Sequence, residues 1–168
     1  DPDNRRPVDY GKRIQLLSDI KTQWREDAER LLADLLATKE DGSVKLFLLM
    51  RSLAARHQFK DVFESGSYEP LEIVGEHSQH VVAYARAEGD KTIVVAVPRF
   101  LTEIVEPGSM PCGEAVWKDT AIKLPGDVSG PWRNWLSDRA VEVREDATES
   151  LMVKDVFLHF PVALLCMG

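Results

Sequence analysis

Histidine and cysteine are the side chains with the widest chemical range in this sequence, and neither type forms a complete reactive set. His77 and His80 lie three residues apart beside Glu76. This is an incomplete pattern, because zinc sites take three or four ligands at recognisable spacing. No nucleophile-elbow motif supports a Ser-His-Asp triad. Cys112 and Cys166 form no CxxC pair, so we expect reduced thiols, as in a cytoplasmic protein. The sequence predicts neither a bound metal nor a cofactor.

The tryptophan side chains allow two interpretations. They are Trp24, Trp117, Trp132 and Trp135. Indole rings can stack on the faces of pyranose rings and so form a sugar platform, whereas large aromatic side chains more often complete a hydrophobic core. The rings are not spaced as an exposed row. We therefore favour the core and keep carbohydrate stacking as the alternative.

The opening residues, Asp-Pro-Asp-Asn-Arg-Arg-Pro, combine charged side chains with two prolines and are predicted to form a loop. Asp1 can accept hydrogen bonds and Arg5 can donate them in a fixed fork, so they could contact a ligand or pair with each other. Asp9 stands just before a helical pattern, where a carboxylate can cap the helix. We therefore expect a structural role for Asp9 and for Arg6.

The first third of the chain must position this loop, and its pattern is helical. Apolar residues recur every three or four positions between residues 8 and 39, as one long helix or as two helices with a kink near 22–25. Gly42 can adopt the left-handed conformation that ends a helix, and Ser43 can cap the next one. That next helix is predicted over 44–57.

From residue 68 onward, short β-rich runs alternate with turn residues. The runs that predict strands are 81–85, 92–97, 115–117, 120–124, 141–143 and 151–160. Several short strands with regular turns favour an antiparallel β-sandwich. The sequence therefore predicts an α+β chain in two domains, with helices over 1–67 and a β-sandwich over 68–168.

The overall composition limits the class of protein. Apolar residues make up 44% of the 168 residues, which supplies a core and argues against disorder. A net charge of −7, from 28 acidic and 21 basic residues, argues against nucleic-acid binding, which needs a clustered basic face. No signal peptide is visible, and no apolar run approaches the roughly 18 residues of a membrane helix. We expect a cytoplasmic protein that binds neither nucleic acid nor membrane.

Several stretches resemble enzymes of the α-amylase superfamily. Residues 1–10 resemble the loop after the last strand of its catalytic barrel, and residues 53–71 resemble the junction between the last barrel helix and the terminal β-domain. Further motifs resemble the maltooligosyltrehalose synthase family, and they are Val82-Ala83-Tyr84-Ala85-Arg86, Val97-Pro98-Arg99-Phe100, Trp117-Lys118-Asp119-Thr120 and Phe160-Pro161-Val162-Ala163-Leu164-Leu165. The resemblance covers nearly the whole chain, but only the C-terminal fraction of such an enzyme.

The resemblance implies that the helices of 1–67 come from the end of a (β/α)8 barrel in an isomerase of trehalose biosynthesis. Such an enzyme converts the reducing-end α-1,4 linkage of a maltooligosaccharide into an α,α-1,1 linkage by intramolecular transglycosylation. Its catalytic carboxylates, about 5–5.5 Å apart in a retaining enzyme, would precede Asp1, so we expect no catalytic residue here. In related enzymes the Asp and Arg of this loop reach sugar hydroxyls, which implies substrate contacts for Asp1 and Arg5.

Three hypotheses follow. The chain is the inactive C-terminal portion of this enzyme, or its β-domain is a carbohydrate-binding module, or the β-domain is a structural module that covers the end of the barrel. The third predicts an exposed apolar patch through which the isolated chain could form a homodimer. We favour the first and third together. The expected partners are the catalytic barrel and, through it, a maltooligosaccharide.

Overall fold

The structure is a computed structural model that describes residues 7–126, 130–145 and 149–167. The chain divides into two compact units, residues 1–50 and residues 51–168. The secondary structure changes from helix to strand between Glu64 and Glu69, and a domain boundary at 67/68 stays a prediction.

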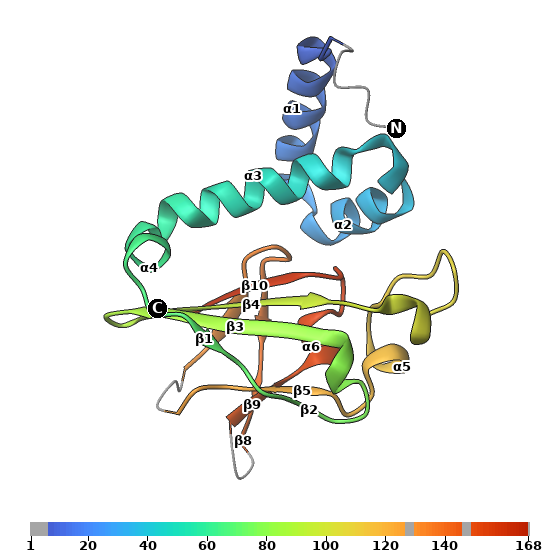
Figure 1. Cartoon of the computed structure of the whole chain (residues 1–168). Coiled ribbons are helices and arrows are strands. Elements are labelled where there is room, and N and C mark those ends of the chain that lie inside the picture. The colour runs from blue at the N-terminus through green and yellow to red at the C-terminus, as the bar shows by residue number, and fades with distance from the viewer. Residues whose placement is uncertain (1–6, 127–129, 146–148, 168) are drawn as a thin grey trace. The chain divides into compact units, whose positions relative to one another are not determined.

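Helices build the first unit (Figure 1). They are α1 (Tyr10–Glu26), α2 (Ala28–Ala37), the 3-10 helix η1 (Lys39–Asp41) and the first part of α3 (Ser43–Gln58). The helical conformation is interrupted at Asp27, whose backbone is extended with φ −157° and ψ 95°. The Asp27 carboxylate then caps α2 by accepting from the Arg30 N–H at 3.0 Å. The region 8–39 thus forms two helices, and the break lies slightly after the predicted 22–25.

The core of the first unit is small. Its buried apolar side chains are Ile20, Leu31, Leu32, Leu35 and Phe47. Gly42 is left-handed at φ 82°, as its position predicted. The carboxylate of Asp41, rather than the hydroxyl of Ser43, supplies the acceptor at the start of α3, since it receives the Ser43 N–H at 2.7 Å.

Strands dominate the second unit, which also contains the rest of α3 and α4 (Lys60–Glu64). The strands are β1 (Glu69–Pro70), β2 (Ile73–Val74), β3 (Val81–Glu88), β4 (Lys91–Pro98), β5 (Ala121–Lys123), β6 (Trp132–Asn134), β7 (Arg139–Val141), β8 (Val143–Glu145), β9 (Glu149–Met152) and β10 (Ala163–Met167). Short helical turns lie between them, and they are η2 (Ser78–His80), η3 (Leu101–Glu103), α5 (Glu114–Trp117) and α6 (Val153–Val156).

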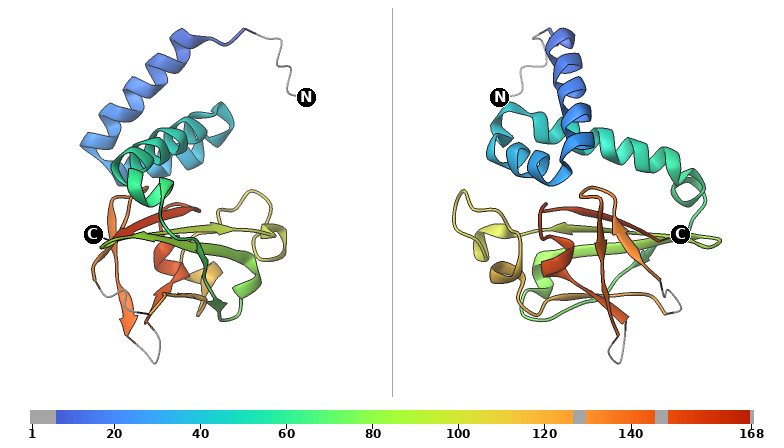
Figure 2. Two further views of the ribbon diagram at one scale, coloured as in Figure 1. Left: turned by 60° about the vertical axis from the view of Figure 1, so that its left-hand side comes forward. Right: turned by 180° about the vertical axis from the view of Figure 1, so that it is seen from behind.

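Two antiparallel sheets form the layers of this unit (Figures 1 and 2). A six-stranded sheet has the order β1-β3-β4-β10-β6-β7, and a four-stranded sheet has the order β2-β5-β9-β8. The chain crosses from the six-stranded to the four-stranded sheet after β1, β4 and β7, and it returns after β2, β5 and β9. Both sheets contribute side chains to one core, including Val94 and Trp132 from the first and Ile122 and Leu151 from the second. The predicted α+β class, with helices followed by antiparallel sheets, is confirmed.

One predicted strand is wrong, and a second is wrong in part. Residues 115–117 belong to helix α5, because the left-handed Gly113 starts a turn there that buries Trp117. The run 151–160 stays extended only to Met152. Val153, Val156 and Phe157 then enter the core at a spacing of three and four residues, which is the helical spacing seen in α6. Within the described ranges, no helix is both long and apolar enough to cross a membrane.

Candidate functional site

The two residues predicted to bind substrate, Asp1 and Arg5, lie outside the residues that the structure describes, as does Arg6. Substrate contact by Asp1 and Arg5 therefore stays a prediction. Asp9 is described, and its Oδ1 accepts from the backbone N–H of Lys12 at 2.9 Å. This bond caps α1 and confirms the capping role that was predicted for Asp9.

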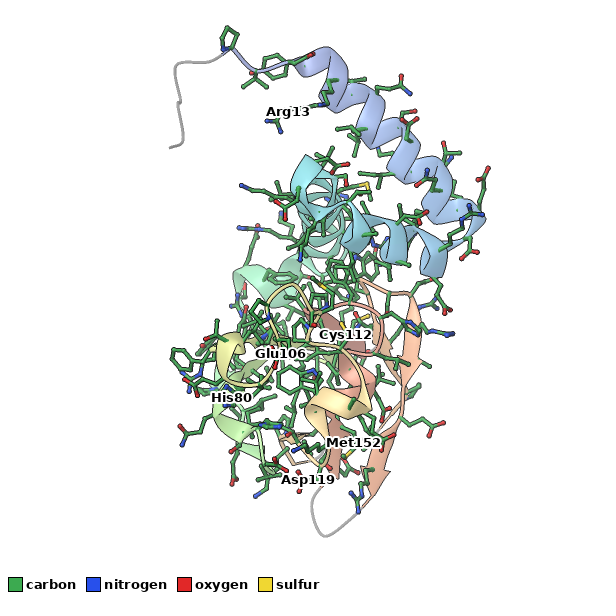
Figure 3. The ribbon with its side chains drawn as sticks, turned by 90° about the vertical axis from the view of Figure 1, so that its right-hand side faces the viewer. Arg13, His80, Glu106, Cys112, Asp119 and Met152 are labelled. Carbon is green, nitrogen blue, oxygen red and sulfur yellow. The ribbon has the colours of Figure 1, made fainter. Side chains whose placement is uncertain are left out.

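Two of the sequence motifs meet at one corner of the strand unit. This motif corner comprises residues 75–80, 99–100 and 118–120. Asp119 Oδ1 accepts from the backbone N–H of Glu76 at 3.0 Å, and Thr120 Oγ1 accepts from the N–H of His77 at 3.1 Å. The motif 117–120 therefore holds the segment that leads into β3, and Figure 3 labels His80 and Asp119 in this part of the molecule.

The motif 97–100 holds the same segment at its other end. The backbone N–H of Arg99 donates to the His80 carbonyl at 2.8 Å, and Arg99 Nε donates to the Gln79 carbonyl at 2.8 Å. The Arg99 guanidinium also lies over the Phe100 ring, 4.9 Å from its centroid. Since charged donors to carbonyls are among the stronger hydrogen bonds, Arg99 fixes the turn before β3.

Backbone geometry explains why this corner needs its residue types. Gly75 has φ +96°, and a Cβ built there would lie 2.7 Å from the Asp119 carbonyl oxygen. Only glycine combines that conformation with so close an approach. Lys118 and Phe100 also have positive φ, at 47° and 52°. For residues with a Cβ this conformation is costly, so surrounding contacts must hold it.

The ionisable groups of the motif corner pair exposed side chains with two half-buried histidines. Glu76 Oε1 pairs with Lys118 Nζ and lies 3.7 Å from His77 Nε2. His80 Nε2 lies 3.8 Å from Glu103 Oε2. The two imidazole rings meet edge to face, with centroids 5.7 Å apart. Among the described residues, no group of three His, Cys, Asp or Glu could hold a metal ion.

Arg86, in a third motif, holds the junction between helix and strand. Its guanidinium donates to three backbone carbonyls, Phe63 at 2.7 Å, Gly66 at 2.8 Å and Ser67 at 3.1 Å. A Cβ at Gly66 would lie 2.4 Å from the Val62 carbonyl oxygen, so the chain must turn on a glycine here. Arg86 belongs to the motif 82–86, but its sequence context predicted no role for it. Arg86 and the glycine-containing end of α4 are distant in sequence and meet only in the fold. No local sequence pattern could therefore have indicated this contact.

Two of the tryptophans lie in the hydrophobic core, and a third lines a surface groove. Trp117 and Trp132 are buried, and Trp117 Nε1 donates to the Pro111 carbonyl at 2.8 Å. The core interpretation is confirmed for these two. Trp24 is half-buried, 5.5 Å from the Phe47 ring.

Trp135 is half-buried and lines an open groove of about 1150 Å³. Its ring is already in contact with other side chains. The Arg51 guanidinium lies over the ring at 4.8 Å, and the Phe59 ring meets it edge-on at 5.6 Å. Arg51 Nε donates to the Trp135 carbonyl at 3.2 Å, and Trp135 Nε1 donates to the Arg51 carbonyl at 2.9 Å. This arrangement ties α3 to the residue that follows β6 and covers part of the ring surface that a sugar could use.

Cys112 and Cys166 are both free thiols. Burial raises the pKa of Cys112 to about 11 and also raises the pKa of Cys166. A thiol reacts as its thiolate, so neither side chain is activated as a nucleophile.

No family model matches the chain. Two proteins of Mycobacterium tuberculosis, from strains CDC 1551 and H37Rv and both named "Putative maltooligosyl trehalose synthase", are 29% identical to it over 165 residues. The solved structure of a mutant maltooligosyltrehalose synthase from Arthrobacter ramosus matches with a TM-score of 0.66 and 26% identity, over 98% of this chain. The chain is similar to maltooligosyltrehalose synthases in sequence and in fold. It spans 16% of the length of the mycobacterial relatives and 18% of the Arthrobacter structure, in agreement with the predicted C-terminal portion of such a synthase.

The motif residues of this chain form structural contacts. Their polar side chains form hydrogen bonds with backbone groups of the same unit, as seen for Asp119, Thr120, Arg99 and Arg86. Such bonds fix loops, and they leave few free donors or acceptors for a sugar.

Proposed function

We propose that this chain is the C-terminal portion of a maltooligosyltrehalose synthase and acts there as a structural module. The reaction proposed for the whole enzyme is the intramolecular transfer that turns the reducing-end α-1,4 linkage of a maltooligosaccharide into an α,α-1,1 linkage. The observation that carries the proposal is similarity to such synthases along 98% of the chain, in sequence and in fold. The catalytic nucleophile and acid are proposed to lie outside residues 1–168.

The residue chemistry supports a structural role for the strand unit. Its motif side chains bind backbone carbonyls and N–H groups, as Arg86 does at three carbonyls. The proposal also assigns the helices before residue 68 to the end of the catalytic barrel, because residues 53–71 resemble the junction at which such a barrel leads to the terminal β-domain.

The test compares two proteins on maltopentaose. The full-length protein that contains this chain is expected to form a terminal trehalose unit, which is measured as loss of the reducing end. Purified 1–168 is expected to form none. Trehalose-unit formation by 1–168 alone would show that the catalytic groups lie inside it. A folded full-length protein that leaves maltopentaose unchanged would refute the assigned reaction.

The opening loop adds a finer proposal, that Asp1 and Arg5 contact the substrate. It is supported by the resemblance of residues 1–10 to a loop whose Asp and Arg reach sugar hydroxyls, and by the match of donors and acceptors. Arg5→Ala in the full-length protein is expected to raise KM for maltopentaose or to lower kcat. Arg25→Ala, on the exposed last turn of α1, is the matched control. Unchanged kinetics for Arg5→Ala would show that Arg5 does not contact the substrate.

A carbohydrate-binding module remains the alternative function. Trp135 is the half-buried indole of the strand unit, and its ring is covered in part by Arg51 and Phe59. We therefore expect no heat on titration of 1–168 with maltoheptaose at millimolar concentration. Saturable heat that is lost in Trp135→Ala would favour the binding module instead.

A further inference from the structure

The outer face of strands β3 and β4 carries apolar side chains that the described residues of the strand unit leave partly exposed. In the antiparallel register, Val82 faces Val97 and Tyr84 faces Val95, so these side chains share one face. The Tyr68 ring, just before β1, lies 4.9 Å from the Tyr84 ring. We call Tyr68, Val82, Tyr84 and Val97 the outer strip.

The burial pattern shows that the outer strip is not part of the core. Val81, Ala83 and Ala85 alternate with it along β3 and are buried on the opposite face. Tyr68, Val82 and Val97 are 65%, 41% and 38% exposed. A strand with one solvated face normally alternates apolar with polar residues, so an apolar outer face indicates a contact.

The same face is covered at its other end, where helix α4 packs on β3 and β4. There Ile93, which faces Arg86 across the two strands, is fully buried. Helix α4 therefore covers this face along only part of the two strands. The outer strip begins where α4 no longer reaches.

Phe100 gives an independent indication. It follows β4, its backbone is left-handed at φ 52°, and its side chain is 60% exposed. A left-handed conformation is costly for a residue with a Cβ. This chain holds an exposed phenylalanine in that conformation, where glycine or asparagine would be the easier residue.

The size of the outer strip indicates what covers it. A stable interface between separate proteins takes roughly 20–30 residues a side, and four side chains are far fewer. A covalently linked partner needs less area, because linkage raises its effective concentration. The synthase relatives are about six times longer than this chain, which spans 16% of them. A second copy is therefore the weaker candidate.

We infer that the outer strip and Phe100 dock an apolar surface of the same longer polypeptide, outside residues 1–168. This inference rests on the proposed function only in taking the chain as part of a longer protein. It identifies the face of the strand unit that makes the contact.

Hydroxyl-radical footprinting of 1–168 and of the full-length protein tests the inference. In 1–168, Tyr68 and Phe100 are expected to label readily. In the full-length protein their labelling should fall to the rate of Phe157, which is buried in both. Equal labelling of Tyr68 and Phe100 in the two proteins would overturn the inference. Protection in 1–168 that disappears on dilution would identify a second copy as the partner, which also overturns it.

Variants supply the control. Val82→Thr with Val97→Thr keeps β-branched side chains, and Phe100→Asn suits the left-handed backbone, so all three preserve local structure. In the full-length protein they should restore Tyr68 labelling. Leu158→Thr, at an exposed leucine after α6, should not. If Tyr68 stays protected in these variants, the outer strip is not the docking face. Activity on maltopentaose is a separate readout, so protection in an inactive full-length protein would refute the reaction and keep the interface.

Discussion

Arg86 shows how a single side chain fixes the point where helices give way to strands. Its planar guanidinium reaches three carbonyls at once, those of Phe63, Gly66 and Ser67. A lysine ammonium is a single point donor and cannot reproduce this fork. The turn between α4 and β1 therefore depends on the shape of the cation as well as on its charge.

Arg86→Lys is expected to lower the free energy of unfolding of the strand unit by about 1–3 kcal/mol, because part-buried carbonyls lose their donors. Urea unfolding monitored by tryptophan fluorescence measures the change. Arg56→Lys, in the exposed last turn of α3, is the matched control and should shift the value by less than about 0.5 kcal/mol. Equal effects of the two substitutions would show that the fork contributes nothing specific.

The thiol of Cys112 yields a second prediction at this scale. Burial raises its pKa from the usual 9.0 to about 11, so its thiolate fraction at pH 7 falls roughly a hundredfold, while the more basic thiolate is a better nucleophile. Together these effects predict alkylation by iodoacetamide about tenfold slower than for a free thiol. Peptide mass spectrometry after timed labelling measures the rate. Labelling as fast as glutathione would show that the thiol is not shielded.

At the scale of elements, side-chain caps decide where the helices begin. Asp9 caps α1, Asp27 ends α1 and caps α2, and Asp41 supplies the acceptor at the start of α3. Each carboxylate satisfies an N–H that the helix itself cannot pair. The periodicity of residues 8–39 predicted helix and left open a kink near 22–25, but it did not place the break at Asp27, because the apolar spacing continues through it.

Asp27→Ala is expected to destabilise α2 by about 1 kcal/mol, since alanine cannot accept from the Arg30 N–H. Amide exchange in the first turn of α2 should therefore quicken about fivefold. Asp34→Ala, on the exposed face of the same helix, leaves the cap intact and serves as the control. Unchanged exchange at Arg30 would mean that α2 begins without this cap.

At the scale of the molecule, the two units differ in how much core they bury. The helical unit depends on a few apolar side chains around Leu32 and Phe47, whereas the strand unit surrounds Trp117, Trp132 and Phe157. Stability follows buried apolar area, and local opening is easiest where little is buried. We expect the helical unit of 1–168 to open first.

Hydrogen exchange of 1–168 checks this expectation. Amides of α1 and α2 should exchange well before those of β3, β4 and β10, which pair with one another along their lengths. Uniform protection over both regions would instead show one cooperative unit. Adding urea below the main transition should narrow the difference, because opening of the strand unit exposes more surface and therefore depends more steeply on urea.

The sequence by itself determined the helical and β-rich regions, the likeness to maltooligosyltrehalose synthases, the Asp9 cap and the left-handed Gly42, because these depend on local spacing and residue type. Tertiary structure alone decided that 115–117 and 153–156 are helical, since burial of Trp117 and Phe157 overrode β propensity. It also placed the motifs 97–100 and 117–120 in contact with one segment, residues 75–80, and Arg86 in contact with the end of α4. Those contacts join residues 20 to 43 positions apart, and local patterns carry no information about pairings at that separation.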